Sequence, residues 1–206
     1  MRAAHLEILV EEPSMEAFLR ELLPRLLGED QSFSVYPYQC KDDLLDKLPQ
    51  RLRGYAAWLP EDWRVVVIVD RDDDDCALLK ESLERMAADA GLRTRTAVAG
   101  NQLWQLANRI AIEELEAWYF GAWDAVCGVY PRVGTTVPNK AAYRDPDAIA
   151  GGTWEALERL LKRAGYFPSG LRKVEIAREM GRQIDWQTNG SGSFRVFRDA
   201  LIEAVA

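Results

Sequence analysis

Histidine and cysteine are scarce in this sequence, and long apolar runs are missing from it. The single histidine, His5, argues against the imidazole-rich sites that hold zinc or iron. Cys40, Cys76 and Cys127 lie far apart, without the close pairs of zinc and redox motifs, so we expect reduced thiols. No stretch approaches the roughly 20 apolar residues that span a bilayer, and the first residues lack the apolar run of a signal peptide. We therefore expect a cytoplasmic protein that has no membrane segment.

Acidic residues outnumber basic ones, and the excess is uneven along the chain. The net charge of −7 argues against nonspecific affinity for nucleic acid, which requires lysine and arginine to neutralise phosphates. From residue 159 to residue 206, however, nine basic residues outnumber five acidic ones. The acidic part could hold metal while this basic tail contacts a polyanion or an acidic partner. Two solvated surfaces of opposite charge are the alternative.

The first 120 residues alternate between strand-like and helix-like apolar patterns. The run RVVVIVD at 64–70 is continuous and β-branched, which predicts a central strand covered on both faces. Pro24 should kink or end the first helix. The predicted strands are 5–10, 32–38, 64–70 and 92–98, the predicted helices are 14–26, 41–53 and 77–90, a surface loop is predicted at 55–63, and 110–120 could begin as a strand and continue as a helix.

This alternation predicts right-handed crossovers and a Rossmann-like, mainly parallel sheet flanked by helices. After residue 120 the pattern changes to turns and short helices, the clearest at 153–164 and 173–180. We therefore divide the chain into an α/β domain, residues 1–120, and a mostly helical C-terminal extension, residues 121–206, packed on it.

Acidic residues directly follow two of the predicted strands. Glu11 follows the first, and Asp70 ends the third, with Asp72 and Asp74 close behind it. Loops at the carboxyl ends of parallel strands share one edge of the sheet, where ligands bind in open α/β folds. The segment 70–75 carries five carboxylates and one arginine, a concentration of charge that a cation would relieve. Carboxylates are the ligands that Mg²⁺ prefers, so these residues predict a Mg²⁺ site, with Mn²⁺ as the alternative ion.

A third acidic group, Glu113, Glu114 and Glu116, follows the apolar residues at 110–112. In a strand Glu114 and Glu116 would share a face, whereas in a helix Glu113 and Glu116 would. The sequence leaves open which pair points inward. For residues 73–75, helix capping and solvation of a loop are an alternative to metal binding.

Basic residues and a glycine-serine loop in the C-terminal part are candidates for contact with a phosphate backbone. The basic candidates are Lys140, Arg172 and Lys173, for which solvated surface charge is the alternative. Ser191 and Ser193 precede the last helix in a loop that could hold a phosphate through backbone N–H groups. That loop lacks the lysine and the spacing of a P-loop, so it predicts no nucleotide hydrolase, and a flexible linker is equally compatible with it.

The chain has seven tryptophans. Tryptophan usually anchors a core or an interface, and we expect this of Trp58, Trp63, Trp104 and Trp118. Any of them that is exposed could instead stack on the bases of a nucleic acid.

The acidic pattern is similar to that of known proteins. A glutamate that ends the first strand, with Asp70-Arg71-Asp72 after a later apolar strand, resembles the Toprim fold of topoisomerases, primases and overcoming-lysogenization-defect nucleases. Nearly the whole chain resembles the family called domain of unknown function 4276, a Toprim-like group related to those nucleases and often encoded beside an ATPase. The resemblance lies in LEILVEEPSMEAFL, VVVIVDRDDDDC, IAIEELEAWYFG, GGTWEALERLL and NGSGSFRVFRDAL. Glu12 is a difference, because Toprim proteins usually have glycine there.

The resemblance implies a nuclease that hydrolyses phosphodiester bonds in DNA or RNA with one or two Mg²⁺ ions. It implies that Asp70 and Asp72 ligate one ion, while Glu11 binds a second ion or acts as general base. It also implies a separate ATPase subunit in an antiviral, defence-type system. The candidate metal ligands are Glu11, Asp70, Asp72, Asp74, Glu114 and Glu116, and the first three are the candidate catalytic residues.

Two other functions stay open at this stage. A noncatalytic adaptor that docks an ATPase through the basic tail is favoured by Glu12 and by the negative net charge. A phosphatase with an aspartate nucleophile also places Asp-x-Asp after an apolar strand. However, the glycine-containing loop of such enzymes is missing after Asp72, and Glu11 would have no role. The sequence leaves the oligomeric state open, a homo-oligomer included.

Overall fold

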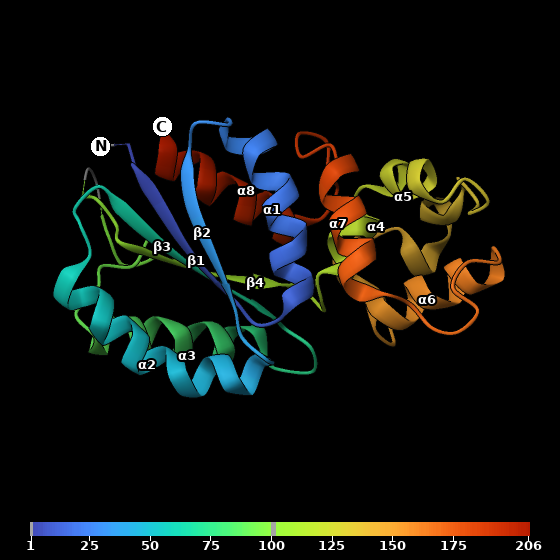
Figure 1. Cartoon of the computed structure of the whole chain (residues 1–206). Coiled ribbons are helices and arrows are strands. Elements are labelled where there is room, and N and C mark those ends of the chain that lie inside the picture. Colours follow the sequence, from blue (N-terminus) through green and yellow to red (C-terminus); the bar gives the residue numbers. More distant parts are fainter. Residues whose placement is uncertain (1, 100–101) are drawn as a thin grey trace.

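The strands form one parallel sheet in the order β2-β1-β3-β4 in the computed structural model, which describes residues 2–99 and 102–206 (Figure 1). Their bounds are β1 (His5–Val10), β2 (Ser32–Pro37), β3 (Trp63–Asp70) and β4 (Leu106–Ala111). β1 pairs with both β2 and β3, and β3 pairs with β4. The predicted α/β fold with a parallel sheet and an internal third strand is confirmed.

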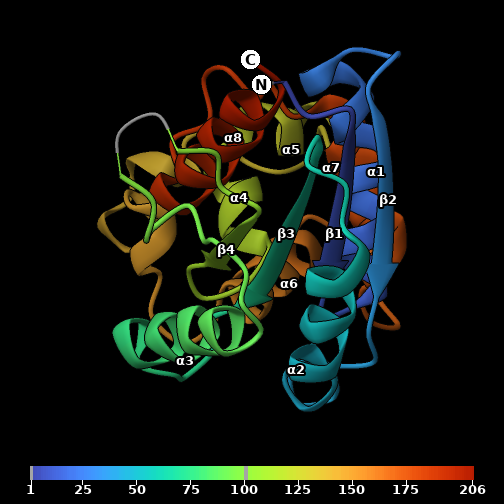
Figure 2. The same cartoon turned by 90° about the vertical axis from the view of Figure 1, so that its left-hand side faces the viewer.

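Helices cover both faces of this sheet. α1 (Pro13–Leu27) and α8 (Gly192–Val205) lie on one face, with α7 (Lys173–Gln183) packed against α1. α2 (Lys41–Trp58) and α3 (Cys76–Asp89) lie together on the other face (Figure 2). Successive residues of β3 alternate between two cores, as Val66 and Ile68 pack on the α1 side and Val65 and Val67 on the α2 side. Burial on both faces explains why β3 is apolar without interruption.

The remaining helices lie beyond one end of the sheet (Figure 1). They are α4 (Glu116–Phe120), α5 (Trp123–Val129) and α6 (Thr153–Arg163), with short 3₁₀ turns at Val137–Asn139, Ala141–Tyr143 and Pro146–Ala148. The chain after residue 120 is helical, and it shares one hydrophobic core with α1 and the sheet. In the described part of the chain, none of the helices is long and apolar enough to cross a membrane. Its three cysteines are free.

Two local predictions are wrong. Residues 92–98 do not form a strand, because only Thr94 makes a bridge, to Leu106, and β4, which begins at Leu106, takes the edge of the sheet. The predicted loop at 55–63 is partly helical, because α2 continues to Trp58 and buries Tyr55 under the sheet. Of the two effects expected of Pro24, a kink or an end, the end does not occur, because α1 continues to Leu27 and stops at a glycine with positive φ.

Close packing of α7 on α1 depends on the absence of a side chain at Gly181. A Cβ atom there would lie 2.4 Å from the backbone oxygen of Phe18. We expect Gly181→Ala to lower the free energy of unfolding by about 1–3 kcal/mol. Gly54→Ala, in α2, is the matched control. Apart from its chain neighbours and the backbone of its own helix, the added Cβ has no described atom within 4 Å, so this substitution should raise the free energy of unfolding by up to about 1 kcal/mol. Urea unfolding of both variants is the measurement, and equal midpoints would contradict this account of the packing.

Candidate functional site

Acidic residues from three strand ends meet at the carboxyl edge of the sheet, which we call the acidic edge. Glu11 follows β1, Asp70 ends β3, and Glu116 opens α4 after a short loop from β4. Because β3 lies between β1 and β4, Asp70 is placed between the other two residues. The topology therefore brings together residues that are far apart in the chain.

Glu11 and Asp70 are in direct contact. Oε2 of Glu11 accepts a hydrogen bond from the backbone N–H of Asp70 at 3.0 Å. Burial raises the pKa of Glu11 to about 7; the hydrogen bond from Asp70 opposes this shift and the negative charge of Asp72 adds to it. Burial also raises the pKa of Asp70 well above its usual range, and the charges of Glu11 and Glu116 add to the effect. Both carboxyl groups therefore hold a proton more strongly than ordinary acids do.

Two buried carboxylate oxygens at the acidic edge have no hydrogen-bond partner among the described residues. They are Oδ1 of Asp70 and Oε2 of Glu116, and we call them the open oxygens. Glu116 is only 2% exposed, and burial raises its pKa to about 8, although the charge of Lys173 opposes this. Burial of a polar atom without a partner costs free energy, so such atoms are uncommon in folded proteins. The open oxygens are therefore free to accept a bound cation or a proton donor.

Tyr119, which the sequence analysis did not select, lies beside these carboxylates. Its hydroxyl is buried and, within the part of the chain described, makes no hydrogen bond. Burial raises the pKa of Tyr119 well above its usual range, and negative charge on Glu116 adds to the shift. The sequence carried no signal for this residue, because an aromatic residue in a short helix is ordinarily part of a core.

The acidic segment after β4 forms a turn and is neither a continuous strand nor a continuous helix. Glu113 has a positive φ of 58° and forms an ion pair with Arg71. Glu114 accepts hydrogen bonds at 3.1 and 2.8 Å from the first two residues of α6, and so caps that helix. Glu116 is buried close to Asp70. The turn thus points the three carboxylates in different directions. Of the three, Glu116 is the one that points inward, toward Asp70.

Lys41 is a second functional candidate that the sequence analysis missed. Its Nζ lies 2.6 Å from the carboxylate of Asp72 and 3.0 Å from that of Asp74. Burial lowers the pKa of Lys41, but hydrogen bonds to both aspartates outweigh it, so the pKa is raised. Lys41 opens α2, which follows β2 and therefore starts at the acidic edge. Glu11 was selected because loops at the carboxyl ends of parallel strands share one edge of the sheet, and we call this the strand-end rule. The same rule could have selected Lys41.

The basic candidates from the sequence differ in where they lie. Nζ of Lys173, at the start of α7, lies 3.8 Å from the carboxylate of Glu12. Burial lowers the pKa of Lys173, but the charges of Glu116 and Glu12 outweigh it and raise the pKa. Arg172 forms an exposed ion pair at the start of the same helix, and Lys140 is exposed in the turn region. Of these three, Lys173 is the residue that reaches the acidic edge.

Ser191 and Ser193 bind a carboxylate of the chain itself. The hydroxyl of Ser191 donates to Asp147 at 2.7 Å, and the backbone N–H of Ser193 donates to it at 2.8 Å. Ser191 also caps α8, since its hydroxyl accepts from the backbone N–H of Phe194 at 3.1 Å. Asp147 thus holds the position at the start of α8 that the sequence suggested for a phosphate.

Two open cavities flank the loop after β3. The first, of about 400 Å³, is lined by Glu11, by residues 40–42 at the start of α2 and by residues 72–74 of the loop. The second, of about 430 Å³, extends from Asp72 to Gly152. Across residues 2–99 and 102–206, no three His, Cys, Asp or Glu side chains are grouped so that they could hold a metal ion as they stand. The chemistry of the donors nevertheless fits Mg²⁺, because they are hard carboxylate oxygens and the open oxygens are free to bind.

No curated protein and no solved structure matches the chain. The model of the family described as Domain of unknown function (DUF4276) matches residues 10–202, which is nearly the whole chain. The protein therefore belongs to the DUF4276 family.

Proposed function

We propose that this protein is a Toprim-type, metal-dependent nuclease that hydrolyses phosphodiester bonds. One observation carries the proposal: Glu11, Asp70 and Glu116 meet at the acidic edge, and two of them present the open oxygens. Buried carboxylates side by side are unfavourable unless protons or a cation neutralise them. Ligands of open α/β sheets bind at this edge, which supports a reaction centre there.

The residues suggest a division of roles. Asp70 and Asp72 would hold one Mg²⁺ ion, with Mn²⁺ as the alternative. When bound, such an ion polarises a phosphate and lowers the pKa of a water molecule. Glu11 would accept the proton of the attacking water or hold a second ion, since a pKa of about 7 suits a general base at neutral pH. Glu116 supplies the carboxylate on the β4 side of Asp70.

Lys41 and Lys173 border the carboxylates on two sides, at the starts of α2 and α7. In the protein alone, their ammonium groups offset part of the negative charge. A phosphate backbone that approaches a protein of net charge −7 needs such local cations. We therefore propose that both lysines contact the substrate backbone when it binds.

A noncatalytic adaptor is the second candidate. Lys41 favours it, because its ammonium group forms ion pairs with both Asp72 and Asp74 and so offsets part of their negative charge. Glu12, which replaces the glycine usual in Toprim proteins, also favours it. In both proposals a separate ATPase subunit of a defence-type system acts together with this chain, as regulator of the nuclease or as the partner that the adaptor docks.

Mg²⁺ or Mn²⁺ should make the purified protein cleave nucleic acid. The assay offers supercoiled DNA, single-stranded DNA and RNA with each ion or with EDTA, and with or without the ATPase subunit. We expect cleavage with an ion, none in EDTA, and no turnover of a small phosphate ester. Binding without cleavage under every condition would instead favour the adaptor, and turnover of the small ester alone would favour a phosphatase.

A further inference from the structure

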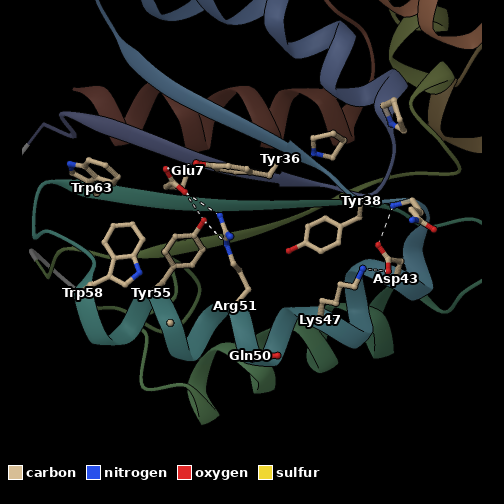
Figure 3. A pocket seen from close by; sticks show the side chains of 14 residues that line it. Glu7, Tyr36, Tyr38, Asp43, Lys47, Gln50, Arg51, Tyr55, Trp58 and Trp63 are labelled. Carbon is tan, nitrogen blue, oxygen red and sulfur yellow. Dashed lines mark hydrogen bonds and ion pairs between the residues drawn. The ribbon is translucent and has the colours of Figure 1, made fainter.

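A cavity between β2 and α2 is larger than either cavity at the acidic edge and has a different chemistry (Figure 3). Its volume is about 1080 Å³. One face of α2 forms its wall along most of the helix, with side chains at helical spacing: Asp43, Lys47, Arg51, Tyr55 and Trp58. We call this cavity the α2 groove.

Aromatic rings from several elements line the α2 groove. They come from Tyr36, Tyr38, Tyr55, Trp58 and Trp63 (Figure 3). Trp58 is 53% exposed and Tyr36 is 37% exposed. The ring centroid of Trp58 lies 5.8 Å from that of Trp63 and 5.4 Å from that of Tyr55. Trp58 and Tyr36 are thus the exposed rings of the groove, whereas Tyr55 is buried, and exposed aromatic rings that lie close together are typical of a binding surface.

A buried carboxylate fixes the floor of the groove. Glu7 is 4% exposed and accepts hydrogen bonds from the hydroxyls of Tyr55 at 2.6 Å and Tyr36 at 3.3 Å. The guanidinium of Arg51 lies 3.7 Å from Glu7 and stands over both tyrosine rings, 4.7 and 5.0 Å from their centroids. The rings are therefore held in place before a ligand arrives, which reduces the entropy lost on binding.

The α2 groove leads to the acidic edge. Gln39 and Asp43 line the end of the groove, and residues 40–42, which lie between them in the chain, line the cavity that contains Glu11. At 1.5 Å per residue, α2 runs about 22 Å from Asp43 to Trp58. That length accommodates several unpaired nucleotides. The end of the groove at Asp43 therefore lies beside the cavity that contains Glu11.

We propose that the α2 groove binds the unpaired bases of a single-stranded nucleic acid and delivers that strand to the acidic edge. The inference rests on the proposed function, for which it names the substrate class. Each base has a π-face, and stacking on an aromatic side chain contributes about 1–3 kcal/mol per base. In a duplex these faces are covered by the neighbouring bases, so they cannot stack on the protein. Lys47 and Arg51 balance the charges of Asp43 and Glu7, so stacking carries more of the affinity than phosphate contacts do.

A protein strand that adds to the outer edge of β2 is the competing occupant, and Pro37 disfavours it. The backbone N–H of Tyr38 donates to Val10, so this N–H points inward and the nitrogen of the preceding residue faces the outer edge. Proline has no N–H to donate there. The outer edge of β2 is thus a poor template for another strand.

Anisotropy of a fluorescein-labelled single strand of about 12 nucleotides, measured in EDTA, tests the groove without cleavage. We expect Trp58→Leu to weaken binding by at least about 5-fold, and Trp58→Phe, which keeps a ring, to restore most of the affinity. Leu78→Ala, which removes a 66% exposed apolar side chain from α3, is the control and should leave binding unchanged. The affinity should fall only weakly with salt, as for one or two phosphate contacts.

Equal affinity of the unchanged protein and Trp58→Leu, or equal affinity for a duplex of the same sequence, would overturn the inference. If Trp58→Leu lost binding to the ATPase subunit while its oligonucleotide affinity stayed the same, the groove would belong to a protein partner and the inference would fail. A protein that binds the single strand through Trp58 but never cleaves it would keep the inference and remove the nuclease proposal. If Trp58→Leu cleaved the nucleic acid with the kcat/KM of the unchanged protein, the groove would not deliver the substrate and the inference would fail.

Discussion

Replacing Asp70 with asparagine is expected to lower metal-dependent cleavage by roughly 10²-fold or more while the protein stays folded. Asp70 is 4% exposed, and it supplies one of the open oxygens between the carboxylates of Glu11 and Glu116. The amide has the same size but carries no negative charge, so it binds a divalent cation weakly. Initial cleavage rates and calorimetric titration with Mg²⁺ measure the two effects.

Asp73→Asn is the matched control for this prediction. It removes the same charge from the same loop, but Asp73 is exposed beside the two cavities. Its cleavage rate should change by no more than a few-fold. If Asp70→Asn cleaved nucleic acid at the same rate as Asp73→Asn, the reaction centre would lie elsewhere in the protein.

The free energy of unfolding of the metal-free protein is expected to fall as the pH rises from 5 to 9. In the folded protein the pKa of Glu116 is raised to about 8 by burial, from an ordinary value of 4.5. Between these two values the folded protein keeps a proton that the unfolded chain has released, so stability falls with rising pH. The contribution is complete below pH 4.5 and is lost as the pH passes 8. The raised pKa of Glu11 also makes the free energy of unfolding fall with rising pH, up to a pH of about 7.

Glu116→Gln should remove the part of this pH dependence that comes from Glu116, while the part that comes from Glu11 and Asp70 stays. Its amide never ionises, so at pH 9 in EDTA the variant should be more stable than the unchanged protein by on the order of 3 kcal/mol. Mg²⁺ should stabilise the unchanged protein most at high pH, because a metal ion binds the deprotonated carboxylates. Urea unfolding at several pH values measures both effects.

Glu29→Gln, in the exposed turn after α1, is the control and should keep the pH dependence of the unchanged protein. A free energy of unfolding that rises from pH 5 to pH 9 in EDTA would contradict the burial of ionisable carboxyl groups at the acidic edge. A Glu116→Gln variant as sensitive to pH as the unchanged protein would assign the effect to other groups.

The strand-end rule located the centre of the candidate site from the sequence, because it depends only on chain order and parallel pairing. Glu11 and Asp70 each follow or end an apolar strand, and they are in contact in the structure. The rule was insufficient after β4, where a residue with positive φ turns the chain and separates Glu114 from Glu116. It applies equally to Lys41, a basic residue that opens the helix after β2.

The sequence by itself determined the parallel α/β fold and the edge where its acidic strand ends meet, since the period of apolar residues records which faces each element must bury. Only the tertiary structure decided which polar partner each of these side chains has. Asp147 accepts a hydrogen bond from the backbone N–H of Ser193. Glu7 contacts Tyr36, Tyr55 and Arg51, which lie between 29 and 48 positions further along the chain. Such pairs depend on how whole helices pack across the sheet, and local periodicity carries no information about that packing.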